Sequence, residues 1–252
     1  MKLLTLARDL KRRKAREKNR LFVAEGVRGV EELLRSPLAI RGVLTAPQLR
    51  EAPRGAALLD SIGTRKVETQ EATALEFASA AETESPQGVI AIAEVPERSL
   101  ADVEPDWRGV LLVLDGVQDP GNVGTILRSA AALGARATLA LPGTVDLWNA
   151  KVVRSAMGAH FKHLAFSCTW DDVDAFRGRT PVPLLAADSR GEPVSNVARA
   201  DRAILVVGNE GAGITDAARG RADTLVSIPI SSDVESLNVA VATGILLYLL
   251  HS

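Results

Sequence analysis

The fold is decided by residues 109–131, which read GVLLVLDGVQDPGNVGTILRSAA. The first six residues are an almost continuous apolar run, typical of a strand that is buried on both faces of a parallel sheet. A glycine-rich turn follows the strand, and the helix after the turn ends near Gly134, which is well placed to stop it. Because α/β folds place their ligands in loops at the C-terminal ends of parallel strands, this turn is a first candidate site.

Further apolar runs continue this pattern towards the C-terminus, and helical segments fit between several of them. The runs cover residues 137–141, 164–166, 183–187, 203–207 and 224–228. Alternating strands and helices predict an α/β domain with a mostly parallel sheet over residues 109–252.

The preceding part of the chain, residues 1–96, predicts a separate small α/β domain. The pattern favours helices over 4–18 and 27–34, and strands at 22–24, 40–45, 66–67 and 89–94. A polar, proline-marked stretch, residues 97–108, predicts a linker between the two domains.

Composition limits the class of protein. Hydrophobic residues make up 46% and charged residues 24% of the chain, which suits a globular protein with a core of its own. Cys168 is the single cysteine, which excludes an internal disulfide framework and a thiolate metal cage. The longest apolar stretch, residues 239–250, is too short to span a bilayer. We expect a cytoplasmic protein with no membrane partner and no metal ion.

Charge is unevenly distributed. Residues 1–20 carry nine Lys and Arg against two acidic residues, although the whole chain has a net charge of −1. A basic arm on an otherwise acidic protein favours local attraction to the phosphates of a nucleic acid. A solvated helix face is the alternative interpretation, and charge alone leaves both open.

Two further loops place polar side chains where a strand ends. Residues 204–214, ILVVGNEGAGI, set one amide and the Glu210 carboxylate among three glycines. Residues 228–242, IPISSDVESLNVAVA, open the last helix with Ser236 and Asn238. Either residue alone is compatible with a helix cap. An amide inside an apolar helix, as expected for Asn238, needs a hydrogen-bond partner.

The three loops, in this order and near these separations, resemble the signature motifs of the SpoU/TrmH family of SPOUT RNA 2′-O-ribose methyltransferases. Residues 151–159, KVVRSAMGA, also resemble a family segment between the first two motifs. The match runs from residue 109 to the C-terminus. Residues 22–26, FVAEG, which follow the basic helix, resemble the N-terminal substrate-binding extension of the family, similar in fold to small RNA-binding ribosomal proteins.

The resemblance implies a fold and a cofactor. Family members bind S-adenosyl-L-methionine (AdoMet) in a deep trefoil knot near the C-terminus. The implied fold class is therefore a trefoil-knotted SPOUT α/β domain after a small α/β, ribosomal-protein-like RNA-binding domain. Gly208, Ile228 and Leu237 are implied to hold the cofactor, mainly through backbone groups and apolar contacts. An apolar slot with a few hydrogen bonds at its edge suits adenine.

The resemblance also implies roles in the in-line transfer of a methyl group to a ribose 2′-oxygen. Arg128 would take part in deprotonating the hydroxyl or, because arginine stays protonated, stabilise the developing alkoxide or grip the phosphate. Asn122 would orient Arg128 or the ribose, and Glu210 would hold the Arg128 guanidinium or line the site. Ser236 and Asn238 would position the target nucleotide and join the loops.

Partners follow from the same resemblance. Family active sites form at a two-fold interface, which implies a homodimer through the knot domain. The N-terminal extension favours structured rRNA over tRNA as the substrate. A non-catalytic RNA-binding or ribosome-assembly protein on the same fold is the alternative. A nucleotide-dependent oxidoreductase is opposed by the glycine spacing of residues 208–213, which reverses the dinucleotide-binding fingerprint.

Overall fold

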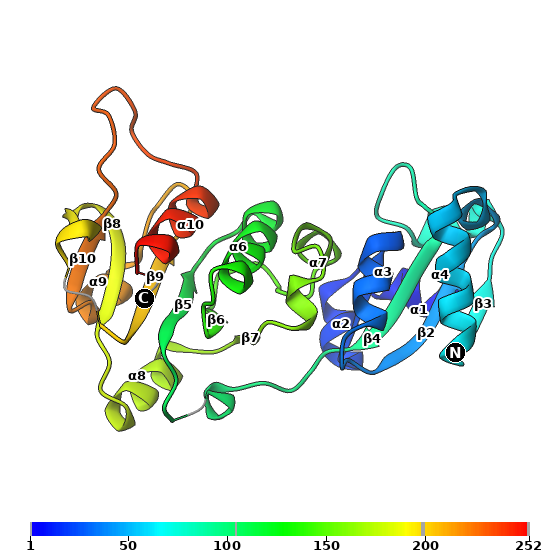
Figure 1. The fold of residues 1–252 in the computed structure, drawn as a ribbon, viewed down its shortest axis with the longest axis horizontal. Helices are drawn as coiled ribbons and strands as arrows, with labels where there is room; N and C mark the ends of the chain where they lie inside the picture. The colour runs from blue at the N-terminus through cyan, green and yellow to red at the C-terminus, as the bar shows by residue number, and fades with distance from the viewer. Residues whose placement is uncertain (1, 104, 198–199, 251–252) are drawn as a thin grey trace. The chain divides into compact units, whose positions relative to one another are not determined.

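A computed structural model describes residues 2–103, 105–197 and 200–250 (Figure 1). Its contacts divide the chain into two units. The N-terminal unit holds the residues up to Glu97 together with Trp148–Lys162, and the C-terminal unit holds Arg98–Leu147 and the residues from His163 onward. The sequence predicts one domain over residues 109–252, and by its contacts the segment Trp148–Lys162 within that range groups with the N-terminal unit.

The N-terminal unit is built on a four-stranded sheet in the order β1-β4-β2-β3. β1 and β2 pair antiparallel with β4, and β3 pairs parallel with β2. Buried side chains of α1 and α5 form a core with residues of β1, β2 and β4. In chain order the elements are α1 (Leu3–Asp9), α2 (Arg13–Asn19), β1 (Leu21–Glu25), α3 (Val27–Leu34), β2 (Ile40–Thr45), η1 (Pro47–Glu51), α4 (Pro53–Thr64), β3 (Thr69–Glu71), α5 (Ala74–Ala80), β4 (Val89–Glu94), α7 (Ala150–Ser155) and η3 (Ala159–Phe161).

Two sequence predictions in this unit are wrong. The single helix over 4–18 is interrupted between α1 and α2, where the buried Arg16 guanidinium donates hydrogen bonds of 2.8 Å to the carbonyls of Leu10 and Lys11. The strand at 66–67 is instead β3, a few residues later, because Lys66 takes a left-handed turn conformation with φ of 53°. The other predicted strands and the helix over 27–34 are confirmed.

An aromatic cluster attaches Trp148–Lys162 to the N-terminal unit. The ring of Phe22 on β1 lies 4.4 Å from that of Trp148 and 5.8 Å from that of Phe161, measured between centroids. The His160 ring stacks on Trp148 at 4.1 Å. These large side chains are buried together, so this segment completes the core beside β1.

The C-terminal unit is built on a six-stranded sheet in the order β10-β8-β9-β5-β6-β7, and every neighbouring pair in it is parallel. The predicted parallel α/β domain is thereby confirmed. Its elements are η2 (Leu100–Asp102), β5 (Gly109–Asp115), α6 (Pro120–Ala132), β6 (Ala137–Ala140), β7 (Ala165–Ser167), α8 (Trp170–Arg179), β8 (Leu184–Pro193), η4 (Val194–Asn196), β9 (Arg202–Gly208), α9 (Asp216–Arg221), β10 (Thr224–Ser227) and α10 (Val239–Leu250).

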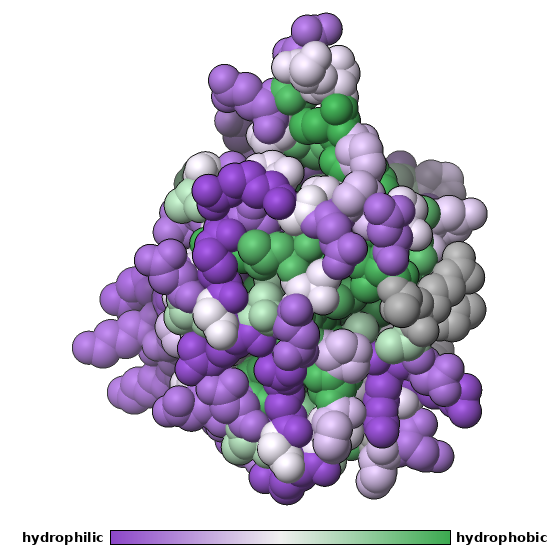
Figure 2. All heavy atoms as spheres, turned by 90° about the vertical axis from the view of Figure 1, so that its left-hand side faces the viewer, coloured by the Kyte–Doolittle hydropathy of each residue, from purple (hydrophilic) through white to green (hydrophobic). Residues whose placement is uncertain are grey.

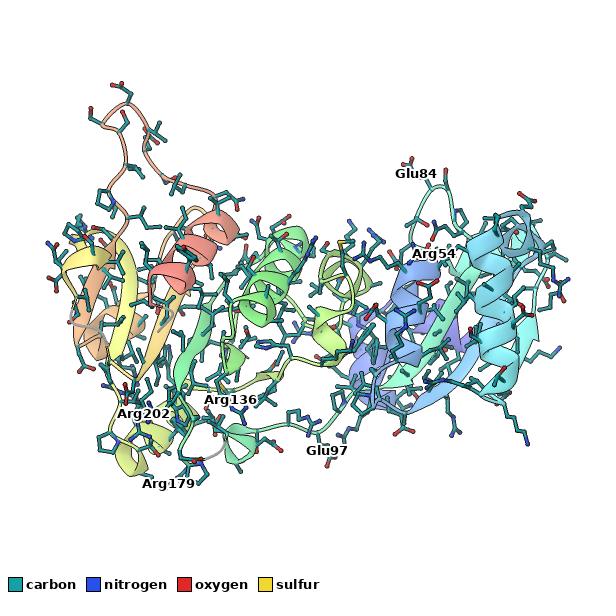
Figure 3. The ribbon with its side chains drawn as sticks, viewed as in Figure 1. Arg54, Glu84, Glu97, Arg136, Arg179 and Arg202 are labelled. Atoms are coloured by element: carbon teal, nitrogen blue, oxygen red, sulfur yellow. The ribbon has the colours of Figure 1, made fainter. Side chains whose placement is uncertain are left out.

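Helices cover both faces of this sheet, which explains why its strands are apolar throughout. Buried residues of α8 and α9 pack on one face, and α10 packs against α6 and contacts β5 and β9. Arg136 and Arg202 mark the edge where β6 and β9 begin (Figure 3). The loops that follow β5, β9 and β10 leave from the opposite edge. Because β5 and β9 are neighbours in register from Gly109 to Asp115, their loops lie side by side.

Among the described residues, none of the helices combines the length and apolar character that crossing a membrane requires. In the same residues, His, Cys, Asp and Glu side chains form no group of three that could hold a metal ion.

Candidate functional site

The first loop is a tight turn that leads directly into α6. Gly116 follows β5 with φ of 78°, a conformation that favours glycine. Asp119 caps α6 by accepting a hydrogen bond of 2.7 Å from the backbone N–H of Asn122. The buried Asp115 carboxylate accepts a bond of 2.7 Å from the N–H of Thr215, beyond the second loop. The first loop is therefore held from both of its ends.

The second loop is organised by Asn209, a residue that our sequence reasoning did not assign to the site. Its Oδ1 accepts from the N–H groups of Gly211 and Ala212 at 2.9 and 3.0 Å, and its Nδ2 donates to the Gly116 carbonyl at 2.9 Å. At Gly208 a Cβ would come within 2.2 Å of the Gly213 backbone, so only glycine fits. An asparagine directly after the strand, within the glycine-rich turn, was the available signal for this role.

Glu210 connects the second loop to the first. Its carboxylate accepts hydrogen bonds from the backbone N–H groups of Gln118 and Asp119 at 3.2 and 3.0 Å, and from Nδ2 of Asn122 at 3.1 Å. Burial raises the pKa of Glu210, but the hydrogen bonds from Asn122 and the backbone outweigh burial and lower the pKa below its usual value. Glu210 therefore serves as a charged acceptor that fixes the start of α6.

Asn238 connects the third loop to the same place. Its Nδ2 donates to Oδ1 of Asn122 at 2.9 Å, while its own Oδ1 accepts from the N–H groups of Ala240 and Val241 at 2.9 and 3.3 Å. Our expectation that Asn238 lies inside the last helix is wrong, because α10 begins at Val239 and Asn238 caps it. We call Asn122, Glu210 and Asn238 the loop junction, since the amide of Asn122 bonds to both other residues and joins the three loops.

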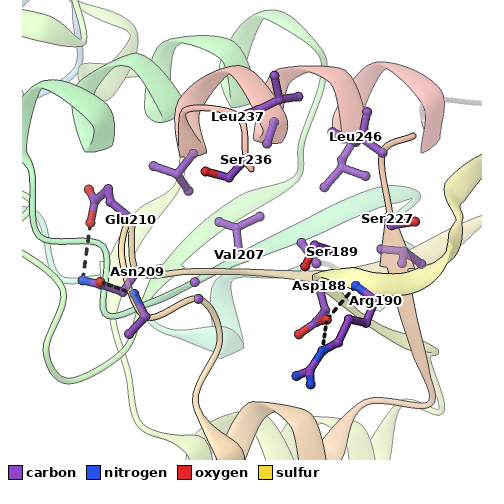
Figure 4. Close-up of a pocket in the computed structure, with 18 of the residues that line it drawn as sticks. Asp188, Ser189, Arg190, Val207, Asn209, Glu210, Ser227, Ser236, Leu237 and Leu246 are labelled. Carbon is purple, nitrogen blue, oxygen red and sulfur yellow. Dashed lines mark hydrogen bonds and ion pairs between the residues drawn. The ribbon is translucent and has the colours of Figure 1, made fainter. Parts of the chain in front are cut away.

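A cavity of about 470 Å³ lies beside the loop junction (Figure 4). It is lined by all three predicted cofactor residues, Gly208, Ile228 and Leu237, and by two of the predicted catalytic residues, Glu210 and Ser236. Asn122, Arg128 and Asn238 are not among its lining residues. Arg128 lies on α6, two turns after the start of the helix, with its side chain exposed.

The lining of the cavity fits AdoMet. The volume lies in the usual range for small-molecule sites, and apolar side chains such as Val207 and Leu246 line it. Gly208 has no side chain, so its backbone lines the cavity directly. Figure 2 shows hydrophobic atoms at the projecting segment that leads to α10 and beneath it, framed by hydrophilic residues. Apolar and polar side chains therefore line the cavity together.

Asp188 supplies the polar group at the other side of the cavity (Figure 4). Burial raises the pKa of its carboxyl, but hydrogen bonds from the backbone of Arg190 and the guanidinium of Arg219 outweigh burial and lower the pKa. The carboxylate is thus neutralised by two arginines that also line the cavity.

Known proteins share both units. Residues 109–248 match the model of the SpoU rRNA Methylase family, and residues 5–91 match that of the MRM3-like substrate binding domain. The chain is 34% identical over 242 residues to 23S rRNA (guanosine(2553)-2'-O)-methyltransferase RlmP of Bacillus subtilis, with 96% of this chain and 92% of that protein covered. It is 31% identical to 23S rRNA (uridine(2479)-2'-O)-methyltransferase of Streptomyces viridochromogenes, with 90% and 81% covered.

A solved structure agrees over the whole chain. The SpoU methyltransferase AviRb from Streptomyces viridochromogenes, in complex with AdoMet, superposes with a TM-score of 0.86 and 28% identity and covers 99% of this chain and 97% of that chain. This chain therefore belongs to the SpoU rRNA methylase family, with an N-terminal MRM3-like substrate binding domain, as the sequence predicted.

Proposed function

We propose that the protein methylates a ribose 2′-hydroxyl of 23S rRNA, with the loop junction and the adjoining cavity as its active site. As a member of its family the chain is an AdoMet-dependent rRNA 2′-O-methyltransferase. The observation that carries the proposed site is the chain of hydrogen bonds Asn238–Asn122–Glu210, which joins three loops at the cavity that Gly208, Ile228 and Leu237 line. Two relatives that match this chain over 90% or more of its length act on 23S rRNA according to their names.

Cofactor binding is assigned to the backbone around Gly208 and to the side chains of Ile228 and Leu237. AdoMet, when bound, supplies an electrophilic methyl group whose sulfonium loses its charge on transfer, so the pocket needs no counter-ion there. The knotted path of the chain that the family resemblance implies stays a prediction.

The 2′-oxygen attacks the methyl carbon in line, the bond from that carbon to sulfur breaks, and the hydroxyl proton passes to solvent water; positioning supplies much of the rate. Arg128 keeps its proton, so we assign it to electrostatic stabilisation of the oxygen as the hydroxyl loses its proton, and to contact with the neighbouring phosphate. Ser236, exposed on the segment before α10 and lining the cavity, is assigned to the target nucleotide. Glu210 and Asn238 hold the loops through Asn122.

We further propose a homodimer through the C-terminal unit. On α10, the apolar side chains of Val241, Tyr248 and Leu249 are exposed by 52%, 70% and 39%. Their spacing of seven and eight residues places them on one face of the helix. An exposed apolar face of this kind suits a second copy of the chain. A cytoplasmic location, as expected from the sequence, is consistent with a ribosomal RNA substrate.

Transfer of labelled methyl from AdoMet to unmodified 23S rRNA, followed by digestion to nucleosides, tests the proposed function. We expect the label in a 2′-O-methylnucleoside, and loss of labelling in Arg128→Ala with AdoMet binding retained. Label on a base would refute the acceptor. No transfer to naked RNA or to ribosomal particles, with AdoMet and RNA both bound, would favour the non-catalytic alternative.

A further inference from the structure

The segment Trp148–Lys162 brings positive charge to the N-terminal unit. It contains Lys151, Arg154 and Lys162 and no acidic residue. Lys162 is paired with Glu32 of α3 at 3.3 Å. Lys151 and Arg154 are exposed on α7, three residues apart, so they project from the same side of that helix.

A second exposed basic pair lies on α2. Lys14 and Lys18 are four residues apart and therefore share a face. In the part of the chain that the structure describes, neither these lysines nor Lys151 and Arg154 take part in an ion pair. Other arginines of the basic arm are paired, as in Arg12–Asp9, Arg13–Glu17 and Arg20–Glu97.

Both helices contact the same strand. α2 and α7 each pack against β1, which is an edge strand of the four-stranded sheet. The stacking of Phe22 with Trp148 and Phe161 fixes the α7 segment at this strand. Two basic pairs that are more than 130 residues apart in sequence are thus presented around one edge of one folded unit.

Three acidic side chains near these helices have basic partners. Glu17 is bonded to Arg13, Glu97 to Arg20, and Glu32 to both Lys162 and Arg35. Their negative charge is therefore locally balanced and opposes little of the field from the two exposed basic pairs.

We propose that Lys14, Lys18, Lys151 and Arg154, which we call the β1 basic surface, together bind the phosphate backbone of the RNA substrate. This inference rests on the proposed function, because the ligand is the rRNA that is methylated. It gives an RNA-binding role to Trp148–Lys162, a segment that lies within residues 109–248, the range that matches the methylase family. Guanidinium and ammonium groups bind phosphates by charge-assisted hydrogen bonds and release counterions, so binding weakens as salt rises.

The test compares the salt dependence of binding to an unmodified 23S rRNA transcript for the full-length protein and three double variants. Lys14→Gln/Lys18→Gln and Lys151→Gln/Arg154→Gln each remove two phosphate contacts. Each should reduce the slope of log K against log salt by roughly 1.4–1.8, from about 0.7–0.9 per contact. The control, Arg41→Gln/Arg65→Gln, removes two exposed charges on β2 and after α4 and should leave the slope unchanged.

The charge-retaining variant Lys151→Arg/Arg154→Lys separates charge from folding and should keep the wild-type slope. An unchanged slope in Lys151→Gln/Arg154→Gln, with the α2 variant reduced, would remove α7 from the surface and overturn the proposal. An equal reduction in the control variant would show only a general charge effect and also overturn it. Methyl transfer by the wild-type protein, measured in parallel, reports on the proposed function separately from these slopes.

Discussion

Replacing Asn122 with aspartate tests the loop junction with almost no change in shape. In the native protein, Nδ2 of Asn122 donates to Glu210 at 3.1 Å while Oδ1 accepts from Asn238 at 2.9 Å. Asn122→Asp keeps the acceptor for Asn238 but turns the donor towards Glu210 into a second carboxylate oxygen. A hydrogen bond is lost and two negative charges face each other.

The magnitude follows from the geometry. Two unit charges about 4 Å apart repel by about 1 kcal/mol in water and about 4 kcal/mol near a protein surface. The lost hydrogen bond adds about 1 kcal/mol. Because the Glu210 side chain is partly solvated, we expect a total cost of about 2–4 kcal/mol for the substitution. If the joined loops are the active arrangement, this cost corresponds to a ~30- to 700-fold loss in kcat/KM for methyl transfer.

The double variant Asn122→Asp/Glu210→Gln provides the decisive comparison. It removes one of the two facing charges and restores a donor opposite the new carboxylate, so it should recover at least half of the lost free energy. Single-turnover transfer of labelled methyl measures both variants, and thermal melting checks that each is folded. Wild-type activity in Asn122→Asp, or a double variant no better than the single one, would refute the idea that this contact holds the active loops.

Three further predictions follow from the same geometry. Gly208→Ala should abolish AdoMet binding in calorimetry and destabilise the protein by roughly 1–3 kcal/mol. The control Gly211→Ala, whose Cβ would meet nothing closer than 3.7 Å, should bind AdoMet normally. Equal affinities of the two variants would contradict the requirement for glycine at position 208. Hydrogen bonds lower the pKa of Glu210, so its contribution to stability is present above the usual pKa of 4.5 and is lost as the pH falls through the lowered pKa. Glu210→Gln should therefore flatten the acid side of a plot of melting temperature against pH. Parallel curves for the two proteins would show that the carboxylate is not involved. Trp148→Ala should lower the free energy of unfolding by about 3–5 kcal/mol, because the Trp148 ring packs on Phe22 in the N-terminal unit. A loss below about 1 kcal/mol in denaturant titration would show that Trp148–Lys162 is not part of that core.

The sheets could be predicted because their strands carry a strong local signal. The runs that became β5 and β9 are apolar on both faces, and this occurs where helices cover both sides of a parallel sheet. The resemblance predicts a cofactor role for Gly208, and this role stays a prediction. What the structure explains is why the position requires glycine, since the Gly213 backbone approaches closely.

The remaining features depend on contacts that local sequence does not encode. The place of Trp148–Lys162 is decided by Phe22, which lies more than 120 residues earlier in the chain. The break between α1 and α2 depends on which carbonyls the buried Arg16 reaches. To predict that Asn238 caps α10, one must know that the helix begins at Val239. Sequence patterns locate the ends of a helix less well than its middle.

The hydrogen bonds of the loop junction limit the mechanism. Both polar atoms of Asn122 and both of Asn238 are engaged, and the Glu210 carboxylate accepts from two backbone N–H groups as well as from Asn122. Groups held in this way position the loops, and we assign substrate contact to Arg128 and Ser236, whose side chains are exposed. Variants should therefore separate into two groups. Changes at the loop junction should lower the melting temperature and kcat together, whereas Ser236→Ala should lower kcat or raise KM for RNA at an unchanged melting temperature. If Asn122→Ala slowed methyl transfer without any loss of stability, this division would be wrong and the amide itself would have to contact the substrate.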